Sequence, residues 1–129
     1  MNPSDAESSP IRSYRNLDVW QVVLDLVEEI YRLTKSFPAD ERCEITSQMR
    51  RAAVSVPSNI AEGYGRSSRK EYRRHVSIAN GSLSELKAQF IIAGRLGFVT
   101  RDEGKMAWEL IQQSGRMLAG LIRSWGKPA

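Results

Sequence analysis

Residues 45–64 have the sequence ITSQMRRAAVSVPSNIAEGY, in which apolar residues recur every three or four positions. The apolar row consists of Ile45, Met49, Ala53, Val56, Ile60 and Tyr64. This period is typical of an amphipathic α-helix with one apolar face. Pro57 has no amide hydrogen and crowds the carbonyl of Ala53, so we expect a kink near Pro57 rather than a break. Gly63-Tyr64-Gly65 then ends the predicted helix as a C-cap.

A polar row lies opposite the apolar row of this helix. It consists of Arg51, Ser55, Asn59 and Glu62. A polar row on a helix is usually exposed to solvent. In this helix Pro57 leaves the carbonyl of Ala53 without its usual amide partner, and we therefore expect nearby polar side chains or waters to satisfy that carbonyl.

Three further segments have the same helical period. Residues 17–34 carry two adjacent apolar rows, a wide face that suits a bundle helix. The first row is Leu17, Trp20, Leu24, Val27 and Tyr31, and the second is Val19, Val23, Leu26, Ile30 and Leu33. Ser68 with Glu71, and Thr100 with Glu103, have the spacing of capping boxes, which predicts that helices begin there. The expected core rows are Tyr72, Val76, Ala79, Leu83, Leu86, Phe90 and Ala93, and Ala107, Leu110, Ser114, Leu118, Leu121 and Trp125.

Four helices joined by short connections predict an all-α fold, an antiparallel up-down-up-down four-helix bundle. We expect the bundle to span residues 16–126, with the second helix kinked near Pro57. Residues 1–15 are polar and contain prolines, which predicts a disordered N-terminal tail, and residues 127–129 form a C-terminal tail.

The residues that usually carry catalysis or bind metals are scarce. The single histidine, His75, lies beside the core row of the third helix, which is typical of a packed or solvent-edge imidazole rather than a general base. One histidine and one cysteine, Cys43, are too few for a metal cluster. Gly63-x-Gly65 lacks both the preceding strand and the third glycine of a dinucleotide-binding loop. We therefore expect no enzyme activity, no cofactor and no metal.

The chain also lacks the usual signs of export or membrane insertion. Its single cysteine cannot form an internal disulfide, and no apolar run approaches the about 20 residues needed to span a bilayer. The polar N-terminus has no apolar middle like that of a targeting signal. We expect a cytoplasmic protein with no membrane partner.

Positive charge is concentrated at the start of the third helix, although the net charge of the chain is only +4. The candidate nucleic-acid-binding residues are Arg66, Arg69, Lys70, Arg73 and Arg74. Their spacing places them in one stripe on the first two turns. A charge run is usually a solvated face, but helix N-termini carry partial positive charge and favour acidic residues instead. Cations, free amides and nearby serines together favour phosphate groups.

The predicted topology gathers further cations at the same pole of the bundle, where the first and third helices start and the fourth ends. They are Arg12, Arg15, Arg123 and Lys127. The opposite pole mixes cations and acids in nearly equal numbers. This asymmetry favours a polyanionic partner over a merely soluble surface.

Four motifs resemble a known family. They are Leu17-Asp18-Val19-Trp20, the stretch from Thr46 to Gly63, Arg69-Lys70-Glu71-Tyr72, and the stretch from Gly81 to Leu86. Over about residues 15–125 the chain resembles the four-helix-bundle family of 23S rRNA intervening-sequence proteins, named for reading frames inside insertions in bacterial 23S rRNA genes. That family is similar in fold to the accessory variability determinant of diversity-generating retroelements, a basic pentameric barrel that binds nucleic acid and a reverse transcriptase. Lys87 departs from the pattern, since many relatives have an acidic residue there.

We therefore expect a non-enzymatic oligomer that binds RNA or structured DNA through phosphate groups, without sequence specificity. The resemblance implies a homopentamer, a link to rRNA insertions, or a reverse transcriptase as partner. Two apolar rows on the first helix also favour assembly, because large exposed apolar patches usually mark interfaces. The alternative is a protein–protein assembly module with no nucleic-acid role.

Overall fold

The structure, a computed structural model, describes residues 17–66 and 68–126. These residues form four long helices: α1 (Asp18–Thr34), α2 (Ser47–Tyr64), α3 (Arg69–Arg95) and α4 (Arg101–Gly126). Two short helical turns, η3 (Ala39–Glu41) and η4 (Arg42–Thr46), precede α2, and the described part of the chain contains no strand. The predicted all-α fold with four helices is confirmed. The predicted tails, residues 1–15 and 127–129, lie outside the described residues.

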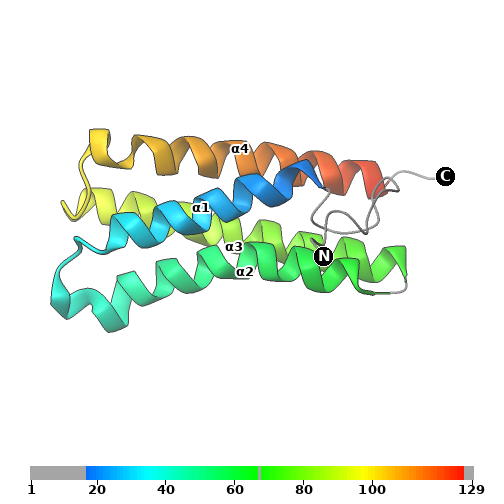
Figure 1. The fold of residues 1–129 in the computed structure, drawn as a ribbon, viewed down its shortest axis with the longest axis horizontal. Helices are drawn as coiled ribbons and strands as arrows, with labels where there is room; N and C mark the ends of the chain where they lie inside the picture. The colour runs from blue at the N-terminus through cyan, green and yellow to red at the C-terminus, as the bar shows by residue number, and fades with distance from the viewer. Residues whose placement is uncertain (1–16, 67, 127–129) are drawn as a thin grey trace, which may run out of the picture.

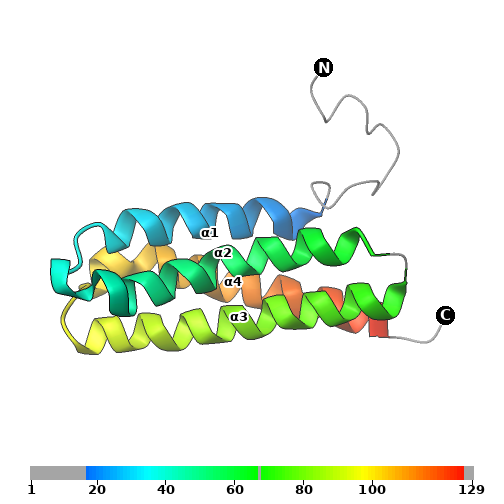
Figure 2. The same cartoon turned by 90° about the horizontal axis from the view of Figure 1, so that it is seen from below.

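Consecutive helices run in opposite directions along the bundle (Figures 1 and 2). α1 packs on α2 and α4, α3 packs on the same two helices, and α1 and α3 lie diagonally across the bundle. The start of α1, the end of α2, the start of α3 and the end of α4 therefore meet at one end, called here the proximal end. The other end, where α3 passes into α4, is called the distal end.

The buried core follows the apolar rows of the sequence. In α1 the row from Val19 to Leu33 is buried, whereas most of the row from Leu17 to Tyr31 is half-buried against the rest of the bundle. In α3 every expected core residue is buried except Phe90, which is half-buried. The row expected for α4 is partly wrong: Ile111 is buried, whereas Leu110 is only half-buried. The side chain of Trp125 lies outside the described residues.

The second helical segment is bent, and its non-helical backbone lies earlier than Pro57. Glu44, within the π-helical turn η4, has φ −111° and ψ −115°. Pro57 is buried inside α2, which continues to Tyr64. The expectation that Pro57 does not end the helix is therefore confirmed.

The polar row of α2 turns toward α3 in its middle part. Ser55 Oγ lies 2.8 Å from Ser82 Oγ of α3. Asn59 Nδ2 donates to the Ser55 carbonyl at 2.9 Å, and Asn59 Oδ1 lies 3.4 Å from His75 Nδ1. The backbone acceptor used by Asn59 is therefore the carbonyl of Ser55. These contacts add a line of hydrogen bonds to the α2–α3 interface.

Gly63 permits the closest approach of α2 to α3. A Cβ atom on this buried residue would lie 2.6 Å from Cβ of His75 and 3.3 Å from the carbonyl oxygen of Tyr72, too close for real atoms. Gly65 is the C-cap of α2, and its amide donates to the carbonyl of Ala61 at 3.3 Å. The two glycines thus have different roles, because Gly65 caps the helix as expected whereas Gly63 is required for packing.

We expect Gly63→Ala to lower the free energy of unfolding by about 1–3 kcal/mol, because the new methyl group overpacks the α2–α3 interface. Gly81→Ala is the matched control: no described heavy atom lies within 4 Å of its Cβ position in the exposed middle of α3. That change should raise the free energy of unfolding by about 0.5–1 kcal/mol. Urea unfolding of both variants measures the difference, and equal stabilities would contradict the packing role of Gly63.

Candidate nucleic-acid interface

The start of α3 is fixed by the predicted capping residue. Ser68 has extended backbone dihedrals, and its hydroxyl accepts a hydrogen bond from the amide of Glu71 at 3.1 Å. An N-cap of this kind satisfies one of the amides that a helix start leaves unpaired. The helix therefore begins at Arg69, and the following residues follow its register.

The structure brings the five predicted cations together at the proximal end. All of them are exposed: Arg66 lies in the connection between α2 and α3, and Arg69, Lys70, Arg73 and Arg74 lie on the first two turns of α3. Figure 2 shows these turns at the green end of α3, where the connection from α2 arrives. The five residues are called here the basic stripe.

Two members of the basic stripe form ion pairs with nearby glutamates of α2 and α3. Arg66 Nη2 lies 2.7 Å from Glu62 Oε1, and Arg74 Nη1 lies 3.6 Å from Glu71 Oε2. All four side chains are about half-exposed or more, and such surface pairs contribute little to stability. Lys70 and Arg73 form no ion pair with any described residue. The basic stripe therefore retains a net positive charge at the surface.

Of the other cations predicted for the basic pole, only Arg123 is among the described residues. Arg123 is exposed in the last turns of α4, at the same end as the basic stripe. Arg12, Arg15 and Lys127 lie outside the described residues. The described members are thus consistent with the predicted accumulation of positive charge at the proximal end.

An aromatic pair lies beside the basic stripe. The rings of Tyr64 and Tyr72 meet edge to face, with centroids 5.6 Å apart. Burial raises the pKa of Tyr72 to about 12, with a smaller contribution from the charge of Tyr64, and burial also raises the pKa of Tyr64. Both phenols are therefore neutral at physiological pH, so they add no negative charge next to the stripe.

The single histidine and the single cysteine of the chain lie in different settings, and the buried Nε2 of His75 has no hydrogen-bond partner among the described residues. His75 is buried at the α2–α3 interface beside Asn59, and Cys43 is exposed. The described residues contain no group of three or more His, Cys, Asp or Glu side chains that could hold a metal ion. Nor does any described helix combine the length and apolar character needed to cross a membrane.

A cleft that the sequence did not indicate lies at the distal end, between the last turns of α3 and the first turns of α4, with a volume of about 570 Å³. Thr100, which lines this cleft, belongs to the capping box of α4: Thr100 N donates to Glu103 Oε1 at 2.9 Å, and Glu103 N donates to Thr100 Oγ1 at 3.2 Å. The first of these bonds is the main reason why the pKa of Glu103 is lowered. The spacing of this capping box was predicted, but the cleft depends on how two helices pair.

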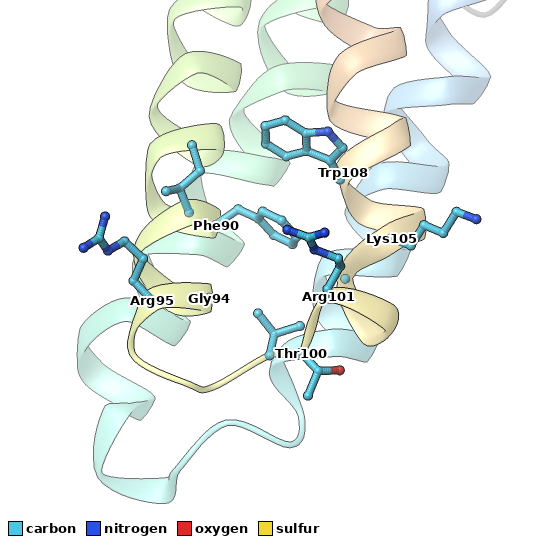
Figure 3. Close-up of a pocket in the computed structure, with 10 residues that line it drawn as sticks. Phe90, Gly94, Arg95, Thr100, Arg101, Lys105 and Trp108 are labelled. Atoms are coloured by element: carbon cyan, nitrogen blue, oxygen red, sulfur yellow. The ribbon is translucent and has the colours of Figure 1, made fainter.

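The distal cleft combines aromatic and cationic residues. The rings of Phe90 and Trp108 stack with centroids 6.0 Å apart, and Lys87 Nζ lies 5.3 Å from the Trp108 centroid. Figure 3 shows Arg101 lying across the cleft toward Phe90, whereas Arg95 and Lys105 extend outward from the two walls. Lys87 therefore contributes positive charge next to an aromatic ring.

The raised pKa of Tyr72 predicts a loss of stability at alkaline pH. Because the folded protein favours the neutral phenol, this stabilisation is complete below the unfolded pKa of about 10 and is lost as pH rises toward about 12. Tyr72→Phe should remove this part of the pH dependence, which has a slope of at most about 1.4 kcal/mol per pH unit. Urea unfolding between about pH 9 and pH 11 measures it, and parallel curves for both proteins would contradict the assignment.

Comparison with known proteins identifies the family of the chain. No curated protein matches it significantly in sequence. The family model described as 23S rRNA-intervening sequence protein matches residues 15–120, which include the basic stripe and most of the four helices. The chain therefore belongs to the 23S rRNA-intervening sequence protein family.

Proposed function

We propose that this protein is a non-enzymatic, oligomeric nucleic-acid-binding protein of the cytoplasm. The basic stripe contacts phosphates of RNA or structured DNA without reading sequence. The observation that carries the proposal is the placement of five exposed cations at the start of a helix. The partial positive charge of a helix N-terminus adds to the attraction of these cations for phosphate.

The family favours RNA as the first ligand to test. Its name refers to sequences that intervene in 23S rRNA, although a family name alone assigns no binding activity. The resemblance to the retroelement accessory protein adds structured DNA and a reverse transcriptase as proposed partners. Sequence-independent binding follows from phosphate contacts, because base edges carry the sequence information and phosphates do not.

Assembly into a closed ring, proposed as a pentamer, would multiply the attraction. α1 presents a half-buried row that includes Trp20, Leu24 and Val27, and Met106 of α4 is 59% exposed. These apolar surfaces support contact with a second copy. In a cyclic assembly the basic stripes repeat around one axis, so that a long polyanion can engage several of them at once.

The same apolar surfaces support an alternative, in which the protein is an assembly module whose partner is another protein. In that case the basic stripe is a solvated helix face. The two proposals differ in whether removal of the charge changes the binding of nucleic acid.

Replacing Arg69, Lys70 and Arg73 together with Gln should weaken RNA binding, because counterions are released only where cations meet phosphates. The slope of log K against log salt should fall by about 0.7–0.9 for each lost contact. A matched control replaces Lys35, Arg42 and Arg51, three exposed cations elsewhere, with Gln. Fluorescence anisotropy at several salt concentrations measures both proteins. If the stripe variant binds as the control does, the interface is wrong.

Assembly is tested by light scattering of the full chain at micromolar concentration. We expect a mass well above the 14.6 kDa of one chain, with five copies giving about 73 kDa. Burial of the half-exposed row of α1 supplies the driving force. A mass of one chain at all concentrations would contradict the assembly proposal but would leave phosphate binding by a single copy open to measurement.

A further inference from the structure

Cations continue along α3 well beyond the basic stripe. From the stripe residues Arg69 and Arg73, the same face of α3 leads to Lys87 and Arg95. Asn80 and Ser84 lie between them at helical spacing. α3 has 27 residues, which corresponds to a length of about 40 Å. The face is therefore polar and basic over most of the length of the bundle.

α4 presents a matching face beside it. Its cations are Arg101, Lys105, Arg116 and Arg123, all exposed. Successive members are 4, 11 and 7 residues apart, so they share one side of the helix, on which the exposed Glu109 also lies. Because α3 and α4 pack against each other, the two faces flank one groove, called here the α3/α4 groove.

Two clefts form the floor of the α3/α4 groove. The distal cleft has been described above. A middle cleft of about 330 Å³ is lined by the polar and basic residues Asn80, Ser84, Lys87, Gln112 and Arg116, together with Leu83, Ile111, Gly115 and Ala119. Lys87 connects the two, since it lines the middle cleft while its ammonium group lies near Trp108 in the distal cleft. None of the described residues that line either cleft is acidic.

The distal cleft has the features of a site for an unpaired base. Phe90 and Trp108 form its aromatic part, and Ile91 beside them is 45% exposed. Gly94 keeps the wall of α3 open, since no described heavy atom lies within 4 Å of its Cβ position. Bases of single strands stack on such apolar and aromatic surfaces, whereas bases inside a duplex are not accessible to them.

We propose that the α3/α4 groove holds one strand of unpaired nucleic acid, with its phosphates along the cations and a base in the distal cleft. The proposal rests on the proposed function and extends the site from the basic stripe to the distal end. A polyanion fits better than an acidic protein helix, because cations recur along the groove and no described residue that lines either cleft is acidic. A partner protein with an apolar face would instead find exposed aromatic and apolar side chains mainly in the distal cleft.

A steric block tests the base site without changing charge. Gly94→Leu fills the distal cleft, and the matched control Gly81→Leu places the same side chain on an exposed part of α3 that lines neither cleft. The ligand is an unstructured RNA of about 12 nucleotides, within the range of known single-strand sites. We expect Gly94→Leu to lower its affinity roughly 5- to 100-fold and Gly81→Leu to leave it unchanged. Affinity for a duplex of equal length should not change in either variant. Equal single-strand affinities for the two variants would overturn the proposal.

A charge test addresses the middle of the groove. Lys87→Gln with Arg116→Gln should lower the slope of log K against log salt by about 1.4 for the single strand, at about 0.7 per contact. Arg42→Gln with Arg51→Gln removes the same charge from exposed positions outside the groove and should keep the slope of the wild-type protein. The same slope for both double variants would overturn the phosphate path.

The outcomes separate this proposal from the proposed function. If the stripe variant loses RNA binding but the groove variants do not, the proposed function stands and the groove is wrong. If the wild-type protein binds no nucleic acid, both are wrong. Competition with polyglutamate of equal charge decides the class of ligand: displacement of the RNA at equal concentration would show that the groove selects acidic chains in general, which overturns the proposal.

Discussion

The close contact between α2 and α3 determines where the basic residues lie. Among the described residues this is the most extensive helix pair, and Gly63 allows the backbone of α2 to approach His75 without a side chain in between. The hydrogen bond between Ser55 and Ser82 fixes the two helices farther along. With both helices held in this way, the connection between them can be short, and Ser68 starts α3 in a register that turns its cations outward.

Features that depend on one helix were predictable from the sequence. The buried row of α1, the capping boxes at Ser68 and Thr100, and the clustering of the basic stripe all follow from the period of a single helix. Features that depend on two helices were not. The period of α4 does not reveal which apolar residues face the centre, so Ile111 was missed as a core residue. The role of Gly63 likewise depends on a neighbour 12 residues away, which no local pattern identifies.

The same distinction applies to the candidate sites. Arg69, Lys70 and Arg73 are close in sequence, and their shared face could be deduced from helical spacing alone. The distal cleft joins Phe90 of α3 with Trp108 of α4 across a turn, and it depends on the lateral offset of the two helices. Lys87 was singled out from the sequence, but the ring of Trp108 that its ammonium group contacts could not be named.

The diagonal placement of α1 and α3 has a consequence for the rate at which the protein associates with a charged partner. Asp18, Asp25 and Glu28 are exposed on α1, whereas the basic stripe residues of α3 lie on the helix diagonally opposite. Each chain therefore carries an electric dipole across its width in addition to its net charge. Such a field turns a diffusing polyanion toward the basic side before contact and can raise association rates roughly 10- to 1000-fold. Since the field decays over a Debye length of about 8 Å at physiological salt, the orientation is selected only in the last stage of approach.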